Sequence, residues 1–170
     1  MPPMSETRIR AIEKRGGALI EDLVFEGPDG SEVEAYLVRP VAGREASGAA
    51  AGFLMWHWLE TQAPDGNRTQ FLEEATGLAR AGAVCLLPQG RFPWTDPPTG
   101  STADRAAVEA EVARLHAGLD LLAERPDVDP RRLAVVGHDF GGMLAAVAAA
   151  EEGRLRALVI IAATPRWGDW

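Results

Sequence analysis

The fold of this chain is decided by the stretch from Leu133 to Ala150, which reads LAVVGHDFGGMLAAVAAA. A short apolar run is interrupted by a glycine, an acid and a pair of glycines, and a run of small residues follows. This pattern predicts a buried strand, a sharp turn and a helix. Glycines are needed on both sides of such a turn, because strand and helix pack too closely for a Cβ atom.

The turn GHDFG, residues 137–141, has the form of a nucleophile elbow. In an elbow the central residue lies on a strained backbone, and its side chain is exposed above a parallel sheet. Serine is usual at the centre, whereas this chain has Asp139. The backbone N–H of the next residue, Phe140, is then expected to be one oxyanion-hole donor. We expect the second donor in the loop after the third strand, at Trp58 or Leu59.

Together with the preceding VDPRR at residues 128–132, this stretch resembles the α/β-hydrolase superfamily, especially its dienelactone-hydrolase-like branch. The aspartate at the elbow is similar to that of haloalkane dehalogenases, epoxide hydrolases and fluoroacetate dehalogenases. The resemblance extends from about Gly17 to Trp170. It implies an α/β-hydrolase fold, and it implies that a complete domain continues with further strands that carry the remaining catalytic residues.

Composition and charge limit the kinds of partner. A chain of 170 residues with 46% hydrophobic and 25% charged residues is typical of one soluble globular domain. Its net charge of -8 argues against nucleic acid and anionic membrane surfaces as partners. The single cysteine, Cys85, cannot form an internal disulfide, and no signal peptide or membrane-spanning run is evident. We therefore predict a cytoplasmic protein that acts on a small molecule.

Two parts are expected along the chain. Residues 1–16 are polar, charged and weakly periodic, and they predict a flexible or loosely helical arm. Residues 17–170 are expected to form an α/β-hydrolase domain that lacks its C-terminal strands. Strand-like segments at 18–25 and 32–38 flank the turn signal GPDG, so the domain is expected to open with an antiparallel hairpin.

Buried strands and amphipathic helices alternate after the hairpin. Besides the elbow strand, strands are expected at residues 49–56, 83–87 and 155–162, and helices at 68–81, at 103–122 and from the elbow to about 152. Asn67 or Thr69 is expected to cap the first of these helices. The alternation predicts a doubly wound, mostly parallel sheet.

The loops at the carboxyl ends of these strands are expected to form the site, because open α/β sheets bind ligands there. Three side chains in those loops are candidates to line it. His57 is either a substitute general base or a structural residue of its loop, and Arg91 either binds a substrate carboxylate or is solvated. Trp94, like Trp58 and Trp167, either holds a leaving halide through its indole N–H or packs against its neighbours.

An aspartate at the elbow changes the chemistry that is expected. A carboxylate with an ordinary pKa near ~3.9 is ionised at neutral pH and needs no base to attack. Attack on an ester carbonyl gives an anhydride, whereas attack on a saturated carbon gives an aspartyl ester that water can hydrolyse. Asp139 therefore favours alkyl transfer to the carboxylate. The alternative is that Asp139 only holds the turn.

The resemblance implies a general-base histidine on a loop after the last strand, and no such segment is found here. Of the three histidines, His138 is expected to point away from the nucleophile and His116 to be solvated on its helix. Asp169 follows the last predicted strand, where some members of the superfamily carry the acid of the triad. Tyr36 is the sole tyrosine and lies in the hairpin, so ring-opening tyrosines for epoxide hydrolysis are missing.

The leading hypothesis is a hydrolase that acts on a small ester, lactone or halogenated organic substrate, with Asp139 in the nucleophile position. The alternative is a non-catalytic scaffold or interaction protein with the same fold. No residue cluster has metal-ligand spacing and no glycine-rich phosphate loop is found, so neither metal nor cofactor is expected.

The last predicted strand, 155–162, contains the apolar run LVIIAA and is expected at or near the edge of the sheet. Proteins normally cover such edges. The rest of a longer parent, a partner subunit or a second copy of this chain in a homo-oligomer are the candidates to cover it.

Overall fold

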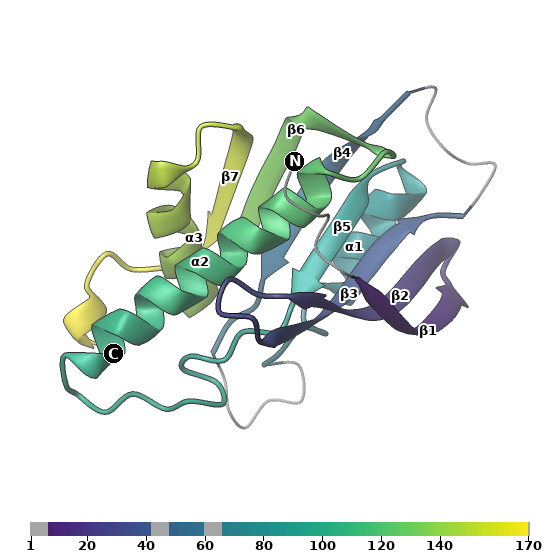
Figure 1. Cartoon of the computed structure of the whole chain (residues 1–170). Helices are drawn as coiled ribbons and strands as arrows, with labels where there is room; N and C mark the ends of the chain where they lie inside the picture. Colours follow the sequence, from purple (N-terminus) through teal and green to yellow (C-terminus); the bar gives the residue numbers. More distant parts are fainter. Residues whose placement is uncertain (1–6, 42–47, 60–65, 170) are drawn as a thin grey trace.

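The computed structural model describes residues 7–41, 48–59 and 66–169 of the chain (Figure 1). Its elements in chain order are β1 (Arg8–Arg15), β2 (Ala18–Glu26), β3 (Glu32–Pro40), β4 (Ala50–Trp56), α1 (Leu72–Arg80), β5 (Val84–Pro88), α2 (Ala103–Ala123), β6 (Val128–His138), α3 (Phe140–Glu151), β7 (Leu155–Ile161) and the 3-10 turn η1 (Trp167–Asp169). Among the helices of these residues, none has the length and apolar character that crossing a lipid bilayer requires.

The strands form one mixed sheet in the order β1-β2-β3-β5-β4-β6-β7. From β5 to β7 the neighbouring strands run parallel, whereas β1, β2, β3 and β5 pair antiparallel. The predicted hairpin is confirmed as β2 and β3, whose pairing runs from Ala18 with Pro40 to Glu26 with Glu32. The parallel half of the sheet therefore carries the elbow, and the antiparallel half extends it.

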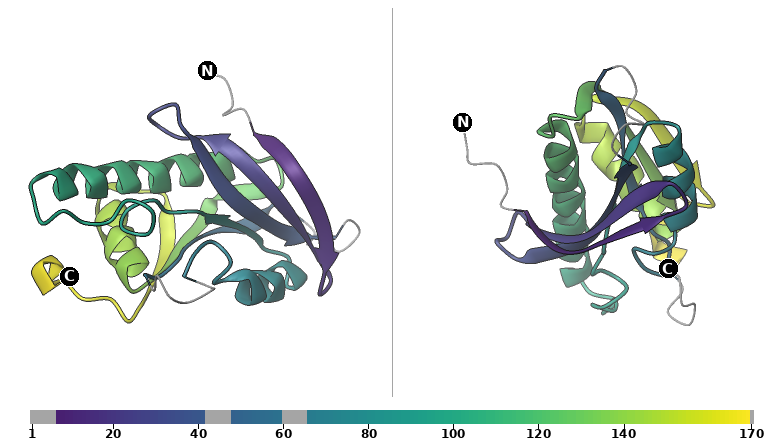
Figure 2. Two further views of the ribbon diagram at one scale, coloured as in Figure 1. Left: turned by 90° about the horizontal axis from the view of Figure 1, so that it is seen from below. Right: turned by 90° about the vertical axis from the view of Figure 1, so that its right-hand side faces the viewer.

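Helices cover both faces of the sheet, as Figure 2 shows. Helices α2 and α3 pack on one face, and α1 packs on the other. The strands serve both layers because successive side chains point to opposite faces. In β4, for example, Leu54 and Trp56 belong to the cluster under α2 and α3, while Met55 belongs to the cluster under α1. The doubly wound α/β architecture expected from the sequence is thus confirmed.

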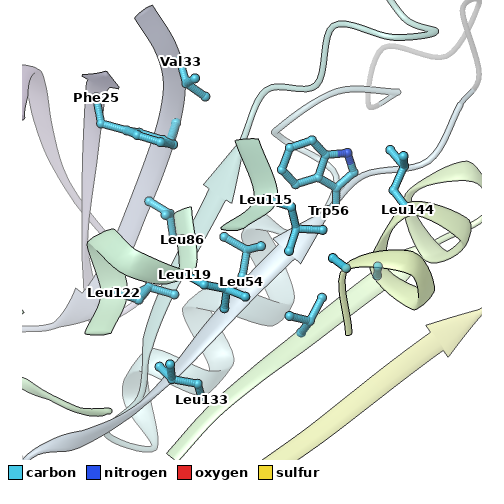
Figure 3. Packing of buried hydrophobic residues seen from close by; sticks show 14 of the residues in the cluster. Phe25, Val33, Leu54, Trp56, Leu86, Leu115, Leu119, Leu122, Leu133 and Leu144 are labelled. Carbon is cyan, nitrogen blue, oxygen red and sulfur yellow. The ribbon is translucent and has the colours of Figure 1, made fainter. Parts of the chain in front are cut away.

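The main core lies beneath α2 (Figure 3). Leu115, Leu119 and Leu122 follow one another at helical spacing, and each is 0% exposed. The helix approaches the sheet closely at Gly118, where a Cβ atom would lie 2.7 Å from Leu54 Cδ1. This contact fixes α2 against the middle of the sheet, so that its N-terminal end reaches the edge at which the elbow lies.

The arm expected over residues 1–16 is a strand in its described part. β1 pairs antiparallel with β2, starting from Arg8 opposite Val24. Every side chain of β1 is exposed, so no apolar face marks this strand in the sequence. Backbone pairing and ion pairs hold it instead, such as Arg10 Nη1 to Glu34 Oε1 at 2.6 Å. Loosely helical structure is therefore not found at these residues.

Helix α1 begins later than predicted, at Leu72 instead of residue 68. The preceding residues form a turn because Asn67 Oδ1 accepts the Thr69 N–H at 2.8 Å and Asn67 O accepts the Gln70 N–H at 3.0 Å. An asparagine that bonds to nearby backbone competes with helix formation in this way. The observed N-cap is Phe71, without a side-chain cap, so neither predicted capping residue holds that place.

Candidate active site

Asp139 has the backbone conformation expected at the centre of an elbow. Its φ is 54° and its ψ is -121°, a left-handed conformation that side chains with a Cβ rarely adopt. Such a conformation costs on the order of 1–3 kcal/mol and persists only when the surroundings impose it. The strand–turn–helix predicted from the sequence is therefore present, with β6 ending at His138 and α3 starting at Phe140.

The glycines around Asp139 are required by close backbone contacts. A Cβ on Gly137 would lie 2.4 Å from Gly141 O, where strand and helix meet. A Cβ on Gly141 would lie 2.2 Å from His57 O and 2.6 Å from Trp56 O. The elbow thus packs its first helical turn directly against the end of β4, which brings the loop after β4 beside Asp139.

Two backbone hydrogen bonds fix the elbow. The Asp139 N–H donates to Ile161 O at 2.8 Å, and Asp139 O accepts the Gly142 N–H at 2.9 Å. The side chain is half-buried, and its carboxylate makes no hydrogen bond or ion pair within the described part of the chain. A fixed backbone therefore presents an unpaired carboxylate at the carboxyl edge of the sheet.

The two predicted oxyanion-hole donors lie on different elements. Phe140 is the first residue of α3. Trp58 lies in the loop after β4, and its N–H donates to Gln70 Oε1 at 2.8 Å. The Trp58 N–H can donate to a substrate only if Gln70 releases it. Leu59, the other residue predicted as the second oxyanion-hole donor, is next to Trp58 in the same loop.

Gln70 is a residue of this site that sequence reasoning missed. Because its Oε1 accepts the Trp58 N–H, its Nε2 faces His138 Nδ1 at 2.6 Å and donates to it. His138 therefore carries its proton on Nε2, and its ring stacks on Trp58 with centroids 5.5 Å apart. Gln70 joins the loop after β4 to the residue before Asp139. A glutamine in a turn gives no local signal of such a role.

His57 does not line the site but lies beneath it. Its side chain is 1% exposed, its Nε2 accepts the Gly90 N–H at 2.9 Å, and its Nδ1 lies 3.1 Å from Trp58 O. Desolvation lowers the pKa of His57 to about 4, so the ring is neutral near pH 7 and donates through Nδ1. Both nitrogens are engaged. The expectation of a site-lining side chain is not met, because His57 joins the ends of β4 and β5.

Trp94 lies next to the elbow. Its ring centroid is 4.0 Å from that of His57 and 6.0 Å from that of Phe140, which it meets edge-on. Its indole N–H donates to Trp58 O. That bond occupies the N–H that a leaving halide would need, so the geometry assigns Trp94 to the packing of the two loops around the elbow.

Arg91 is about half exposed and engaged within its own loop. Its Nε lies 3.2 Å from Asp96 Oδ2, and its backbone N–H donates to Glu111 Oε2 at 3.1 Å. Glu111 is buried and also pairs with Arg114 at 2.8 Å, while burial raises the pKa of the Glu111 carboxyl. α2 thereby holds the loop after β5 through the Arg91 backbone, and the Arg91 guanidinium forms a surface ion pair.

The remaining titratable candidates lie away from Asp139 or outside the described side chains. His116 Nε2 contacts Ala148 O at 3.2 Å, between α2 and α3. Cys85 is buried in β5, and desolvation raises the pKa of its thiol to about 12, so it is inert packing. The side chain of Asp169 is not described. The described residues contain no cluster of three or more side chains suited to a metal ion.

The mixed sheet with helices on both faces and an elbow after β6, between β4 and β7, defines an α/β-hydrolase fold. Within that class, the sequence profile of the Dienelactone hydrolase family matches residues 66–164. The chain belongs to the dienelactone hydrolase family, which confirms the branch predicted from residues 128–150. A comparison with curated protein sequences found no significant match.

Solved structures share this fold at low sequence identity. An acetyl xylan esterase 1 from Thermoanaerobacterium sp. JW/SL YS485 superposes with a TM-score of 0.65 at 18% identity, covering 95% of this chain and 54% of that chain. An acetyl xylan esterase from Paenibacillus sp. R4 gives 0.61 at 18% identity, with coverage of 91% and 52%. The α/β hydrolase GrgF from Penicillium sp. sh18 gives 0.63 at 22%, with 85% and 46%. The chain thus spans about half the length of these structures.

Proposed function

We propose that this chain is a hydrolase that acts on a small ester, lactone or halogenated organic molecule, with Asp139 as the attacking group. The observation that carries the proposal is the Asp139 carboxylate, which is unpaired within the described chain and held on a backbone with φ 54° at a nucleophile elbow. Membership of the dienelactone hydrolase family supports hydrolysis as the reaction class.

The first step is substitution at a saturated carbon. An Asp139 carboxylate oxygen forms a bond to that carbon, and the bond from the carbon to the leaving group breaks. The leaving group is a halide, or the carboxylate of an ester or lactone that is cleaved at its alkyl–oxygen bond. The electron pair leaves with that group, so this step needs no base and releases no proton.

The second step regenerates the carboxylate. Water attacks the carbonyl carbon of the aspartyl ester, the alcohol leaves, and a proton is released to solvent. Negative charge develops on the carbonyl oxygen of the aspartyl ester, and an oxyanion hole stabilises such a charge. The Phe140 N–H is the donor proposed for it. His57 is not suited to be the base, because both of its ring nitrogens are engaged and its side chain is buried.

Labelled water tests the role of Asp139 directly. Short-chain esters, small lactones and haloacids are first screened for turnover, and a single turnover is then run in H₂¹⁸O with enzyme in excess. We expect ¹⁸O in the peptide that carries Asp139, because the water oxygen enters the aspartyl carboxylate. Label found only in the product would show that water attacks the substrate directly, and would overturn the nucleophile assignment.

Asp139→Asn is the matched variant, since it keeps size and hydrogen-bonding capacity but removes the nucleophilic charge. We expect a loss of about a thousandfold or more in kcat/KM, with an unchanged thermal unfolding profile.

A non-catalytic scaffold is the second candidate. It is favoured by the absence, within the described chain, of a hydrogen bond from any of the three histidines to Asp139. If the wild-type chain turns over no substrate class above the rate in buffer, the scaffold replaces the hydrolase as the assignment. Equal turnover by the wild type and Asp139→Asn would instead overturn the role of Asp139.

A further inference from the structure

A cavity of about 340 Å³ opens beside the elbow, at the carboxyl edge of the sheet. Five apolar side chains line it: Phe92, Pro98, Val108, Phe140 and Trp167. They come from the loop after β5, from α2, from the start of α3 and from η1. Figure 1 shows η1 near the N-terminal end of α2, and Trp167 of η1 is one of the lining residues. Its volume is at the lower end of the range for small-molecule sites.

The wall of the cavity is built around the Phe140 ring. The centroid of Trp167 lies 5.2 Å from it at 82°, and that of Phe92 lies 5.9 Å from it at 67°. Both contacts are edge-to-face, the arrangement in which the electron-rich face of one ring meets the electron-poor edge of another. An aromatic ligand can extend this arrangement by adding one more ring, which a saturated or polar group cannot do.

The two charged residues at the cavity already have partners. Asp104 Oδ1 accepts the Thr99 N–H at 2.9 Å, and its Oδ2 accepts the Gly100 N–H at 2.8 Å. Arg105 Nε donates to Glu109 at 2.9 Å, and the Arg105 side chain is 86% exposed. Neither group is directed to a ligand, so the cavity recognises apolar surface and offers no counter-charge.

The cavity adjoins the reacting group through one residue. Phe140 provides the ring at its centre and directly follows Asp139, and the Phe140 N–H is the proposed oxyanion donor. Asp139 is not one of the lining residues but precedes Phe140 in the chain, so we expect a molecule whose ring occupies the cavity to extend its polar end toward the elbow. The opposite orientation would place a polar group against aromatic rings that cannot hydrogen-bond with it.

We propose that this cavity binds the uncharged aromatic part of the substrate, so that the preferred substrates are arylalkyl esters, lactones or halides. The assignment of a ring to the cavity stands on the geometry, and its description as part of a substrate rests on the proposed function. Highly charged or sugar-like substrates lack the group that fits.

Benzyl alcohol, a neutral aromatic product of such a reaction, is the probe, and glycerol is the polar comparison. In ¹H–¹⁵N spectra of the full chain we expect benzyl alcohol to shift the Phe140 amide and Trp167 indole signals saturably at millimolar concentration. Glycerol is expected to leave them unchanged. No saturable shift, or shifts that are confined to other regions, would overturn the proposal.

Two variants test the location. Val108→Trp fills the cavity from α2 and should weaken benzyl alcohol binding about tenfold or more. Trp167→Ala removes one aromatic side chain that lines the cavity and should weaken binding severalfold. Trp167 lies in η1, outside the sheet, so this variant still tests the location if Val108→Trp disturbs folding. Unchanged binding in a folded variant contradicts the proposal.

Asp139→Asn separates the two proposals, because it should bind benzyl alcohol as the wild type does. In the wild-type chain, benzyl alcohol binding without any hydrolysis leaves the cavity assignment standing and removes the proposed function. Hydrolysis by the wild type without benzyl alcohol binding removes the cavity assignment and leaves the proposed function standing.

Discussion

Among the single residues, Asp139 combines a carboxylate side chain, proposed as the nucleophile, with an unfavourable backbone conformation. A positive φ with ψ near -121° suits glycine, which has no Cβ to clash. The site therefore holds this residue in place at a cost to stability, as reactive positions often do.

Asp139→Gly should for this reason stabilise the fold while abolishing the proposed activity. We expect the free energy of unfolding to rise by about 1 kcal/mol relative to Asp139→Ala, after allowance for the greater entropy of an unfolded glycine. Urea unfolding of the two variants measures the difference. Equal stability would show that the conformation at residue 139 is not strained.

His57 makes stability depend on pH. Its pKa in the folded protein is about 4, below the ordinary 6.5, so the unfolded chain binds the proton more readily. Stability is therefore complete above pH 6.5 and falls as the pH is lowered toward 4. The maximum loss from this group is about 3 kcal/mol.

The comparison with His57→Gln isolates this effect from the carboxylates that titrate in the same region. Unfolding free energies of both proteins are measured at a series of pH values between 7 and 4. The difference between them should shrink as the pH falls, and a constant difference would mean that His57 does not titrate in this window.

At the scale of elements, α2 connects two loops that are distant in sequence. Glu111 accepts the Arg91 N–H, and Arg114 pairs with both Glu111 and Asp29 of the turn between β2 and β3. A buried ion pair holds the arrangement together, and the loss of one partner leaves the other charge uncompensated.

Glu111→Ala should lower the free energy of unfolding by about 3 kcal/mol, because buried Arg114 loses its buried partner and keeps only the ion pair with the exposed Asp29. Glu109→Ala is the matched control on the same helix, since Glu109 is exposed and pairs only at the surface with Arg105, and it should change stability by less than about 0.5 kcal/mol. Chemical denaturation measures both. Similar effects of the two variants would contradict a structural role for the buried pair.

The elements that the sequence predicts well are those whose pattern is local. The apolar runs of β4, β5 and β7 and the stripe of α2 all follow from periodicity, and the elbow follows from its glycines. β1 is not predictable in this way, since its residues are all exposed and its partner strand supplies the hydrogen bonds.

The residues of the candidate site differ in the same way: some could be predicted from a local sequence motif and others depend on long-range contacts. Asp139 and Phe140 follow from a contiguous motif, and the structure places both at the elbow. Gln70 and Glu111 act through partners many residues away, so their roles emerge only in three dimensions. The burial of His57 depends on Gly90 and Trp94, which belong to another loop.

At the scale of the whole molecule, the two edges of the sheet differ. β1 ends one side with charged side chains, which discourage pairing with another chain. β7 ends the other side with an apolar run in which Leu158, Val159, Ile160 and Ile161 are 38%, 45%, 45% and 40% exposed. Contiguous exposed apolar surface of this kind promotes association.

The 170-residue chain should therefore associate as its concentration rises, and Val159→Lys should shift it toward the monomer. Light scattering coupled to gel filtration gives the mass at each concentration. Ile12→Lys is the control, because Ile12 is an exposed apolar residue on the opposite edge, and it should have no effect. A wild-type chain that is monomeric throughout would contradict this expectation.

The hydrogen bond from the Asp139 N–H to Ile161 O links the elbow to the edge of the sheet. It joins the backbone of Asp139 to Ile161, the last residue of the edge strand β7, and the end of an edge strand opens more readily than the centre of the sheet. The stability of the elbow conformation therefore depends in part on the edge strand β7. A polypeptide that packs on β7 should therefore also stabilise the backbone conformation of Asp139, which would couple association to the proposed activity.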